Sequence, residues 1–305
     1  MASDKIVITG AAGLLGQNLI RCLKLHGFSN IVAIDKHVEN TSTLQQLHSD
    51  ITIIRADLAC DDGWQHALAN ADVVVCGHGQ IGGVKPELFE RNNILATRRL
   101  LEAARREHVG YLVHISSAAV RSMAVNPYSE SKKMQEAVVK GYEFHTVILR
   151  PTLMFGRFDR KNLGWIARFM RSVPVFPIPG DGRYARQPLY VRDFCEIIRT
   201  CIERRICGEY NISGLTKIDY IDLIRTIRTT LQLPTPIIKI PYRAFKLLLK
   251  IYALINRNPP FTDYQLDAFT TQEEFEVIDW PGIFGVKPTP LDVAIGETFL
   301  DPHYA

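Results

Sequence analysis

Tyr128 and Lys132 are the residues of this chain whose types and spacing point most directly to proton-transfer chemistry. They stand four positions apart in the run YSESK, and a separation of four places two side chains on one face of a helix. An ammonium beside a phenol favours the phenolate and lowers the phenol pKa from its usual value of about 10. We therefore expect Tyr128 to take a proton from an alcohol during oxidation and to return it during reduction.

Glycines near the start of the chain are suited to phosphate binding. Gly10, Gly13 and Gly16 follow the first apolar run, and Leu14 and Leu15 begin an apolar helical stretch. Glycine permits a tight turn and lets a pyrophosphate approach the backbone, while the first turn of a helix offers unpaired N–H groups. Because this GxxGxxG spacing lies between a strand and a helix, it predicts a dinucleotide-binding loop.

Acidic residues that follow the second and third apolar runs predict how the nucleotide is bound. Asp35 can accept hydrogen bonds from the adenosine ribose and would repel a 2′-phosphate, so it favours NAD over NADP. Lys36 comes directly after it and weakens that preference. Asp57 and Leu58 are placed to meet the adenine, although a role in a turn explains Asp57 equally well.

The elements that must position these residues alternate along the first half of the chain. Apolar, β-branched runs predict strands at 6–9, 30–35, 51–55, 72–76, 111–116 and 145–150. Helical patterns lie between them at 14–26, 62–70, 87–108 and 128–140. Strands that are apolar throughout and separated by helices predict an α/β fold with a doubly wound parallel sheet, which binds ligands at the carboxyl ends of its strands.

Length and composition predict a two-part globular protein. We expect residues 1–152 to form a dinucleotide-binding domain, rejoined by about 187–212, and residues 153–305 to form a smaller substrate-binding lobe. A net charge of +4 is too small to indicate nucleic-acid binding. The six cysteines are scattered without a CxxC pair, so they predict reduced thiols and no metal site. The start MASDKIVITG lacks the pattern of a signal peptide, and a cytoplasmic protein is expected.

The segment 242–257 is apolar with interspersed basic residues. This pattern favours a helix of the smaller lobe that faces its core, with a helix lying on a membrane surface as the alternative. The apolar runs are too short to span a membrane.

Several motifs, taken together, resemble one known family. The runs GAAGLLG, NNILATRRLLEAA, HISSAAV, YSESK, LRPTLMFG and ARQPLYVRDF are similar, in this order, to those of the extended short-chain dehydrogenase/reductases, specifically the NAD-dependent epimerase/dehydratase group. The resemblance implies a Rossmann fold and an NAD-dependent enzyme. It implies that the Ser117 hydroxyl binds the reacting oxygen and that Lys132 also binds the nicotinamide ribose. It further implies that Ser116 and Pro151 border the cofactor and that Asn93 is a structural asparagine near the site.

The resemblance also suggests substrate-binding residues. Arg186 lies seven positions before Asp193, matching the arginine that binds the diphosphate in relatives that use nucleotide sugars. Charge-assisted contact with phosphate gives this role a physical basis, and a surface arginine is the competing interpretation. Arg121 replaces the tyrosine that the family often has there, so we expect it to enter the substrate pocket.

These observations predict an NAD-dependent oxidoreductase or epimerase that acts on a nucleotide sugar, as a 4-epimerase or 4-ketoreductase. Dehydration is disfavoured because Ala118 and Ala119 stand where the family's dehydratases place an acidic pair. Two alternatives stay open. One is a dehydrogenase or reductase of an apolar alcohol or ketone, resembling the hydroxysteroid branch, which the short connection between Ser117 and Tyr128 favours. The other is a non-catalytic NAD-binding accessory protein. Analogy with relatives also suggests a homodimer.

Overall fold

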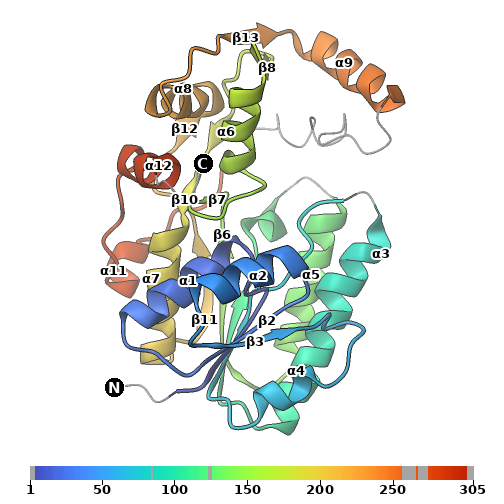
Figure 1. Ribbon diagram of the computed structural model, residues 1–305, viewed down its shortest axis with the longest axis vertical. Helices are drawn as coiled ribbons and strands as arrows, with labels where there is room; N and C mark the ends of the chain where they lie inside the picture. The colour runs from blue at the N-terminus through green and yellow to red at the C-terminus, as the bar shows by residue number, and fades with distance from the viewer. Residues whose placement is uncertain (1–3, 84, 123–125, 256–265, 267–273, 301–305) are drawn as a thin grey trace.

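A seven-stranded parallel sheet forms the centre of the protein in the computed structural model, which describes residues 4–83, 85–122, 126–255, 266 and 274–300 (Figure 1). Its strand order is β3-β2-β1-β4-β5-β6-β11. The strands are β1 (Ile6–Thr9), β2 (Ile31–Asp35), β3 (Thr52–Arg55), β4 (Val73–Cys76), β5 (Tyr111–Ile115), β6 (His145–Pro151) and β11 (Gly208–Ile212). The order reverses between β1 and β4, the point at which such sheets bind dinucleotides.

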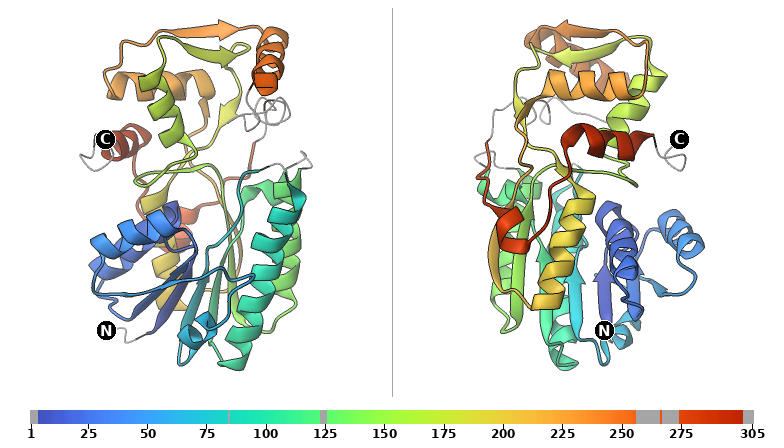
Figure 2. Two further views of the ribbon diagram at one scale, coloured as in Figure 1. Left: turned by 45° about the vertical axis from the view of Figure 1, so that its right-hand side comes forward. Right: turned by 90° about the vertical axis from the view of Figure 1, so that its left-hand side faces the viewer.

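Helices cover both faces of the sheet, as predicted for a doubly wound fold (Figure 2). On one face, α1 (Leu14–Leu25) and α7 (Val191–Arg204) share a core with Ile6, Ile8 and Val113. On the other face, α4 (Ala96–Arg106) shares a second core with Val7, Val74 and Leu112, and α5 (Pro127–Lys140) adds Val139. Successive strand residues thus enter opposite cores, which explains why these strands are apolar throughout.

Three helical segments around the sheet differ from the prediction. The expected helix 87–108 is divided into α3 (Pro86–Phe89), the π-helix η2 (Glu90–Leu95) and α4. The expected helix 62–70 is a 3₁₀ helix, η1 (Trp64–Leu68). A further helix, α2 (Val38–Leu47), was not predicted, because its sequence is mostly polar and it buries only Thr41 and Leu44.

A third core lies beyond the carboxyl ends of the strands. It is formed by α6 (Leu163–Ser172), α8 (Tyr220–Thr230) and α12 (Leu291–Phe299), with β8 (Phe176–Pro179), which pairs with β13 (Ile237–Ile240). Two short pairs connect this region to the sheet: β7 (Met154–Phe155) with β10 (Leu189–Tyr190), and β9 (Ala185–Arg186) with β12 (Ile218–Asp219). We call this part of the chain the smaller lobe.

Two segments near the end of the chain correct the expected organisation. Trp280 and Phe284 of α11 (Trp280–Phe284) pack in the core of the sheet beside α7, so this stretch does not belong to the smaller lobe. The helix α9 (Tyr242–Ile255) does not face a core as predicted, because Leu247 and Leu248 are exposed. No helix among the described residues is long and apolar enough to cross a membrane.

Candidate active site

The loop between β1 and α1 has the geometry of a phosphate cradle. Gly10 adopts φ +67°, and a Cβ atom there would lie 2.8 Å from backbone atoms of Gly77 and His78. At Gly16 a Cβ would lie 2.4 Å from Cα of Ala11, so the helix and loop approach too closely for any side chain. Gly13 is the N-cap of α1 and provides no side-chain hydrogen bond to its first turn. The backbone N–H groups of the first turn of α1 are therefore available to an anion. The residues present fit a dinucleotide pyrophosphate.

Asp35 lies at the carboxyl end of β2 beside this loop. Its carboxylate accepts hydrogen bonds from the backbone N–H groups of Ala12 (3.0 Å) and His37 (2.9 Å), which orient it at the edge of the loop. Lys36 points instead to Asp57 (3.1 Å) and to the side-chain oxygen of Asn92 (2.6 Å). Because Lys36 is held by these partners, it is not directed at Asp35 to offset the repulsion of a 2′-phosphate. The geometry therefore supports NAD.

Asp57 has the turn role that the sequence left open. Its carboxylate accepts a hydrogen bond from the backbone of Ala59 (3.0 Å) and pairs with Lys36 and with Arg91 (2.6 Å). Burial raises the pKa of Asp57, but the hydrogen bonds from Ala59 and Lys36 outweigh it and bring the pKa below its usual value. Leu58 is buried in the core next to the sheet. Contact of Asp57 or Leu58 with adenine stays a prediction.

The structure brings together the three residues predicted to do the chemistry. Tyr128 lies in the first turn of α5, which begins at the capping box of Asn126 and Ser129. Lys132 is buried one turn further on, and its ammonium donates to the backbone carbonyl of Ile115 at the end of β5 (2.8 Å). Ser117 is the second residue after β5 and is a hydrogen-bond partner of Tyr128. The sheet edge and the helix thus position a phenol, an ammonium and a hydroxyl in one place.

The electrostatics of this group differ from the sequence prediction. Burial raises the pKa of Tyr128, and the hydrogen bond with Ser117 offsets this only in part. The expected lowering by the ammonium is not found, since Lys132 directs its protons to Ile115 and to the side-chain oxygen of Gln135. Burial also lowers the pKa of Lys132 to about 8.

The hydroxyl of Ser116 is bound to a buried ion pair. Its hydroxyl donates to Glu136, which forms a two-pronged pair with Arg150 at 2.8 and 2.6 Å. Arg150 also contacts Glu209, joining α5, β6 and β11. Burial raises the pKa of Glu136, but the hydrogen bonds from Arg150 and Ser116 bring it below its usual value. A contact of Ser116 with the cofactor through its backbone stays a prediction.

Lys132 belongs to a buried hydrogen-bond network that the sequence motifs did not reveal. Gln135 accepts from Lys132, and its amide donates to the hydroxyl of Thr97 (2.7 Å). This hydroxyl lies 3.1 Å from Nε2 of His78, whose Nδ1 lies 2.8 Å from the hydroxyl of Thr9. Burial, together with the charges of Lys132 and Lys36, lowers the pKa of His78 to about 3, so the ring is neutral. This hydrogen-bond network connects the ammonium to the end of β1, directly before the glycine loop.

Asn93 lies where the resemblance expects a structural asparagine. It is fully buried in the π-helix η2, whose widened turn is a common feature near functional sites. Its side chain accepts from the backbone of Gln80 (2.6 Å) and donates to the hydroxyl of Ser131 (2.8 Å). Asn93 therefore ties the loop after β4 to α5, next to Lys132.

The predicted substrate residues lie on different elements. Arg186 belongs to β9 of the smaller lobe, and its guanidinium lies over the ring of Tyr184 at 5.0 Å and donates to the carbonyl of Ala185 (2.6 Å). Arg121 ends the short 3₁₀ helix η3 (Ala118–Arg121) and is exposed. Pro151 ends β6 and is buried. Substrate binding by the two arginines stays a prediction.

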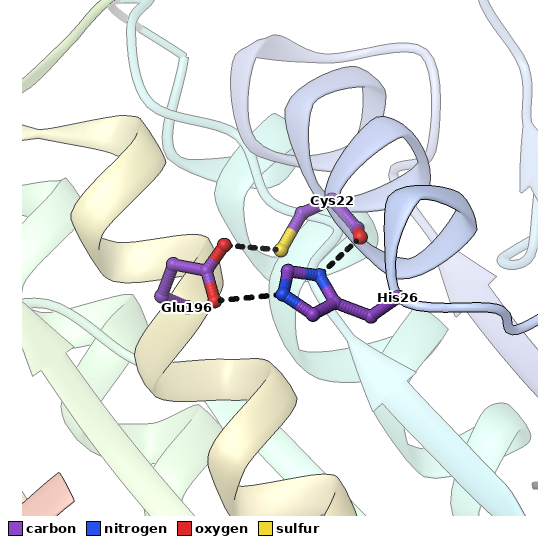
Figure 3. A group of neighbouring side chains, drawn as sticks. All are labelled: Cys22, His26 and Glu196. Carbon is purple, nitrogen blue, oxygen red and sulfur yellow. Dashed lines mark hydrogen bonds and ion pairs between the residues drawn. The ribbon is translucent and has the colours of Figure 1, made fainter. Parts of the chain in front are cut away.

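Two further features lie apart from these residues. A hollow of about 220 Å³ lies among Phe155, Asp193, Trp280 and other residues, and none of the predicted site residues line it. On the α1 side of the sheet, the side chains of Cys22, His26 and Glu196 meet between α1 and α7 (Figure 3). Their ligand atoms lie within 4.8 Å of one another, which is close enough to hold a metal ion.

The contacts within this cluster favour helix packing over a metal site. The thiol of Cys22 donates to Glu196 (3.4 Å), and burial with the nearby carboxylate raises the pKa of the thiol well above its usual value. Metal ligation needs the thiolate. Glu196 is already paired with the guanidinium of Arg199 (2.8 Å). These contacts tie α1 to α7.

Comparison with known proteins gives a consistent assignment. A sequence model of the NAD dependent epimerase/dehydratase family matches residues 6–213. The chain is 28% identical to a ceramide reductase from Caulobacter vibrioides over 58% of this chain and 56% of that protein, so it spans little more than half of that relative. It is 27% identical to a dTDP-glucose 4,6-dehydratase from an Actinoplanes species, over 69% of this chain and 76% of that protein.

The solved structures agree. A UDP-glucuronic acid 4-epimerase from Bacillus cereus in complex with NAD aligns with a TM-score of 0.67 at 25% identity, covering 77% of this chain and 87% of that one. The family match extends over the glycine loop, the Tyr128 helix and the sheet to the end of β11. The chain is therefore an enzyme of the NAD dependent epimerase/dehydratase family, and NAD is its cofactor.

Proposed function

We propose that this enzyme transfers hydride between NAD and a sugar carbon of a nucleoside-diphosphate sugar. The observation that carries the proposal is the meeting of Ser117, Tyr128 and Lys132 at the carboxyl end of β5, the strand next to β4 and the dinucleotide switch point. Bound NAD supplies the hydride acceptor and a positive charge in its oxidised form. Tyr128 takes the proton of the sugar hydroxyl, Ser117 holds the reacting oxygen, and Lys132 binds the nicotinamide ribose.

The nucleotide part of the substrate is assigned to the smaller lobe. Arg186 is half-buried and braced against Tyr184, so its guanidinium is partly ordered before a diphosphate arrives. Arg121 ends η3, the short helix that follows Ser117, and is exposed. Two of the proteins named above act on sugar nucleotides according to their names, which supports this substrate class. We assign the reaction to C4 of the sugar.

Two outcomes of the chemistry are compatible with the same residues. When the keto sugar is released, the enzyme is a 4-dehydrogenase or, in reverse, a 4-ketoreductase. When the keto sugar turns within the site and regains its hydrogen on the other face, the product is the 4-epimer. Ala118 and Ala119 provide no acid or base for dehydration, which supports these two outcomes over loss of water.

A second candidate is the reduction of a lipid ketone. It is favoured by the similarity to a ceramide reductase and by the exposed apolar residues of α9. Ser117, Tyr128 and Lys132 would act in the same way on such a ketone, and Arg186 would then have no phosphate to bind.

The surroundings and assembly are also part of the proposal. All six cysteines are free thiols in the structure, in keeping with a reducing, cytoplasmic setting. Leu95 and Met134, from η2 and α5, are exposed at 43% and 52%. These apolar side chains support a homodimer formed through this pair of helices.

The test is a substrate screen with the purified enzyme and NAD. Wild-type protein is incubated with a panel of nucleoside-diphosphate sugars, and products are separated as 4-epimers or 4-keto sugars, with NADH followed by its absorbance. Tyr128→Phe should abolish turnover, whereas Tyr142→Phe, which removes a phenol hydroxyl further along the same chain, should retain it. Turnover of a long-chain keto lipid and of none of the sugars would support the second candidate instead. Unchanged turnover in Tyr128→Phe would refute both.

A further inference from the structure

The helix α9 presents an apolar strip to solvent at the outer end of the smaller lobe. It directly follows β13, and it lies at the margin of the molecule in Figure 1 and in the left view of Figure 2. Leu247, Leu248 and Ile251 are exposed at 59%, 53% and 47%. Their spacing of three and four places them side by side on one face, while Phe245 and Leu249 on the other side are half-buried. Clustered exposed apolar side chains of this size mark interaction surfaces.

Basic residues border this strip on the same helix. Arg243, Lys246 and Lys250 recur at intervals of three and four, so they form a second stripe next to the leucines. Lys246 lies over the ring of Tyr242, and Arg243 and Lys250 are exposed. The sequence from Tyr242 to Ile255 contains no acidic residue. The helix therefore has an apolar face and a purely cationic flank.

The preceding strand also carries exposed residues. Ile238 and Lys239 of β13 are exposed, Ile238 at 45%. An apolar side chain and a further cation thus lie directly before α9 in the chain. We call Arg243, Lys246, Leu247, Leu248, Lys250 and Ile251 the α9 surface.

We propose that the α9 surface docks the enzyme on a membrane that contains anionic lipids. The leucines and Ile251 enter the boundary between headgroups and acyl chains, and the cations contact lipid phosphates. A helix of 14 residues is about 21 Å long at 1.5 Å per residue, too short for a hydrocarbon core of about 30 Å, so it lies in the plane of the membrane. The cationic flank without a single carboxylate is what favours an anionic bilayer over an apolar protein surface. This inference is independent of the reaction that the enzyme catalyses.

Vesicle flotation with the full chain tests the proposal. Wild-type protein should float with vesicles of equimolar phosphatidylcholine and phosphatidylglycerol and stay behind with phosphatidylcholine alone. The double variant Arg243→Glu/Lys250→Glu should lose roughly thirty-fold or more in vesicle affinity, because each cation near an anionic surface contributes about fivefold. The triple variant Leu247→Ser/Leu248→Ser/Ile251→Ser should lose binding in the same way. High salt should weaken the wild type.

Matched controls separate a membrane site from other effects. Leu25→Ser removes a leucine that is 75% exposed at the end of α1, and Arg106→Glu reverses an exposed charge on α4; both should bind vesicles like the wild type. Thermal unfolding of the α9 variants should match that of the wild type, since the altered side chains are exposed. Failure of the wild type to float, or flotation of the α9 variants at wild-type affinity, would overturn the proposal. So would a wild-type dimer that these variants split without any change in lipid binding.

Discussion

Gln135 accepts a hydrogen bond from the ammonium of Lys132 within α5 and donates one to Thr97, whose hydroxyl is in turn bonded to His78. A lysine ammonium can only donate, so the side-chain oxygen of Gln135 faces Lys132 and its amide nitrogen faces Thr97. The Thr97 hydroxyl then accepts from Gln135 and donates to Nε2 of His78. The neutral ring therefore carries its proton on Nδ1 and donates it to Thr9. One set of directions satisfies every group of the chain.

The first prediction concerns Gln135 as a positioning residue. Gln135→Leu leaves the buried ammonium with one protein acceptor, so its pKa should fall further and kcat should drop by about tenfold at neutral pH. Gln135→Glu restores the acceptor with a negative charge, which should raise the pKa of Lys132 and keep the enzyme active to higher pH. The check is kcat against pH for the three proteins. A loss of kcat in Gln135→Leu with an unchanged pH profile would point to a purely structural role.

The second prediction follows from the pKa of Lys132 itself, which burial lowers to about 8. Reduction of a ketone needs the phenol of Tyr128 protonated, and burial raises the pKa of this phenol. The phenol thus stays protonated while Lys132 loses its charge. We expect kcat/KM for ketone reduction to be level at neutral pH and to fall as the pH rises through about 8. In Lys132→Arg, whose guanidinium stays charged, any remaining activity should show no such fall; the same alkaline limb in that variant would contradict this explanation.

The strands and the glycine loop could be predicted from the sequence because both have local sequence signals. The β-branched runs alternate with helices, and the glycines of the first loop are required by its close backbone approach. The start of α5 also has local signals, since Asn126 caps it and Pro127 occupies its first turn. These features depend on residues next to one another in the chain.

The features that sequence reasoning missed depend on tertiary contacts. Periodicity does not distinguish an α-helix from the π-helix that turns Asn93 toward Ser131. The partners of Lys132 come from β5 and from a glutamine outside any motif, so a pKa lowered by the ammonium was predicted for Tyr128 and a raised one is found. The apolar period of α9 predicts a buried face, but it carries no information on what covers that face.

The third prediction concerns the stability of the ion pair beneath α5. Glu136→Gln leaves the guanidinium of Arg150, only 3% exposed, paired with Glu209 alone, and should lower the free energy of unfolding by about 3 kcal/mol. Glu130→Gln removes a surface pair with Lys133 on the same helix and should cost less than about 1 kcal/mol. Urea unfolding at neutral pH measures both. Equal losses of unfolding free energy in the two variants would show that burial does not determine the contribution of the ion pair.

The sign of the pH dependence of this pair follows from the lowered pKa of Glu136. Because the folded-state pKa lies below the ordinary value of 4.5, the contribution is present above that value and is lost as the pH falls through the folded-state pKa. The stability gap between wild type and Glu136→Gln should therefore shrink on acidification below about 4.5. A gap that stays constant down to strongly acidic pH would contradict the assigned pKa direction.

The last prediction separates backbone strain from close approach in the dinucleotide loop. Gly10 and Gly27 both adopt positive φ, +67° and +85°, so alanine strains the backbone at either position by about 1 kcal/mol or slightly more. At Gly27 an added Cβ meets nothing within 4 Å, whereas at Gly10 it would lie 2.8 Å from backbone atoms of Gly77 and His78. Backbone atoms cannot give way without moving β1 against β4, where the pyrophosphate is expected. Gly10→Ala should therefore weaken NAD binding, measured by calorimetry, by at least about tenfold, while Gly27→Ala should lose only stability. If both variants bound NAD like the wild type, the loop would not be the pyrophosphate site.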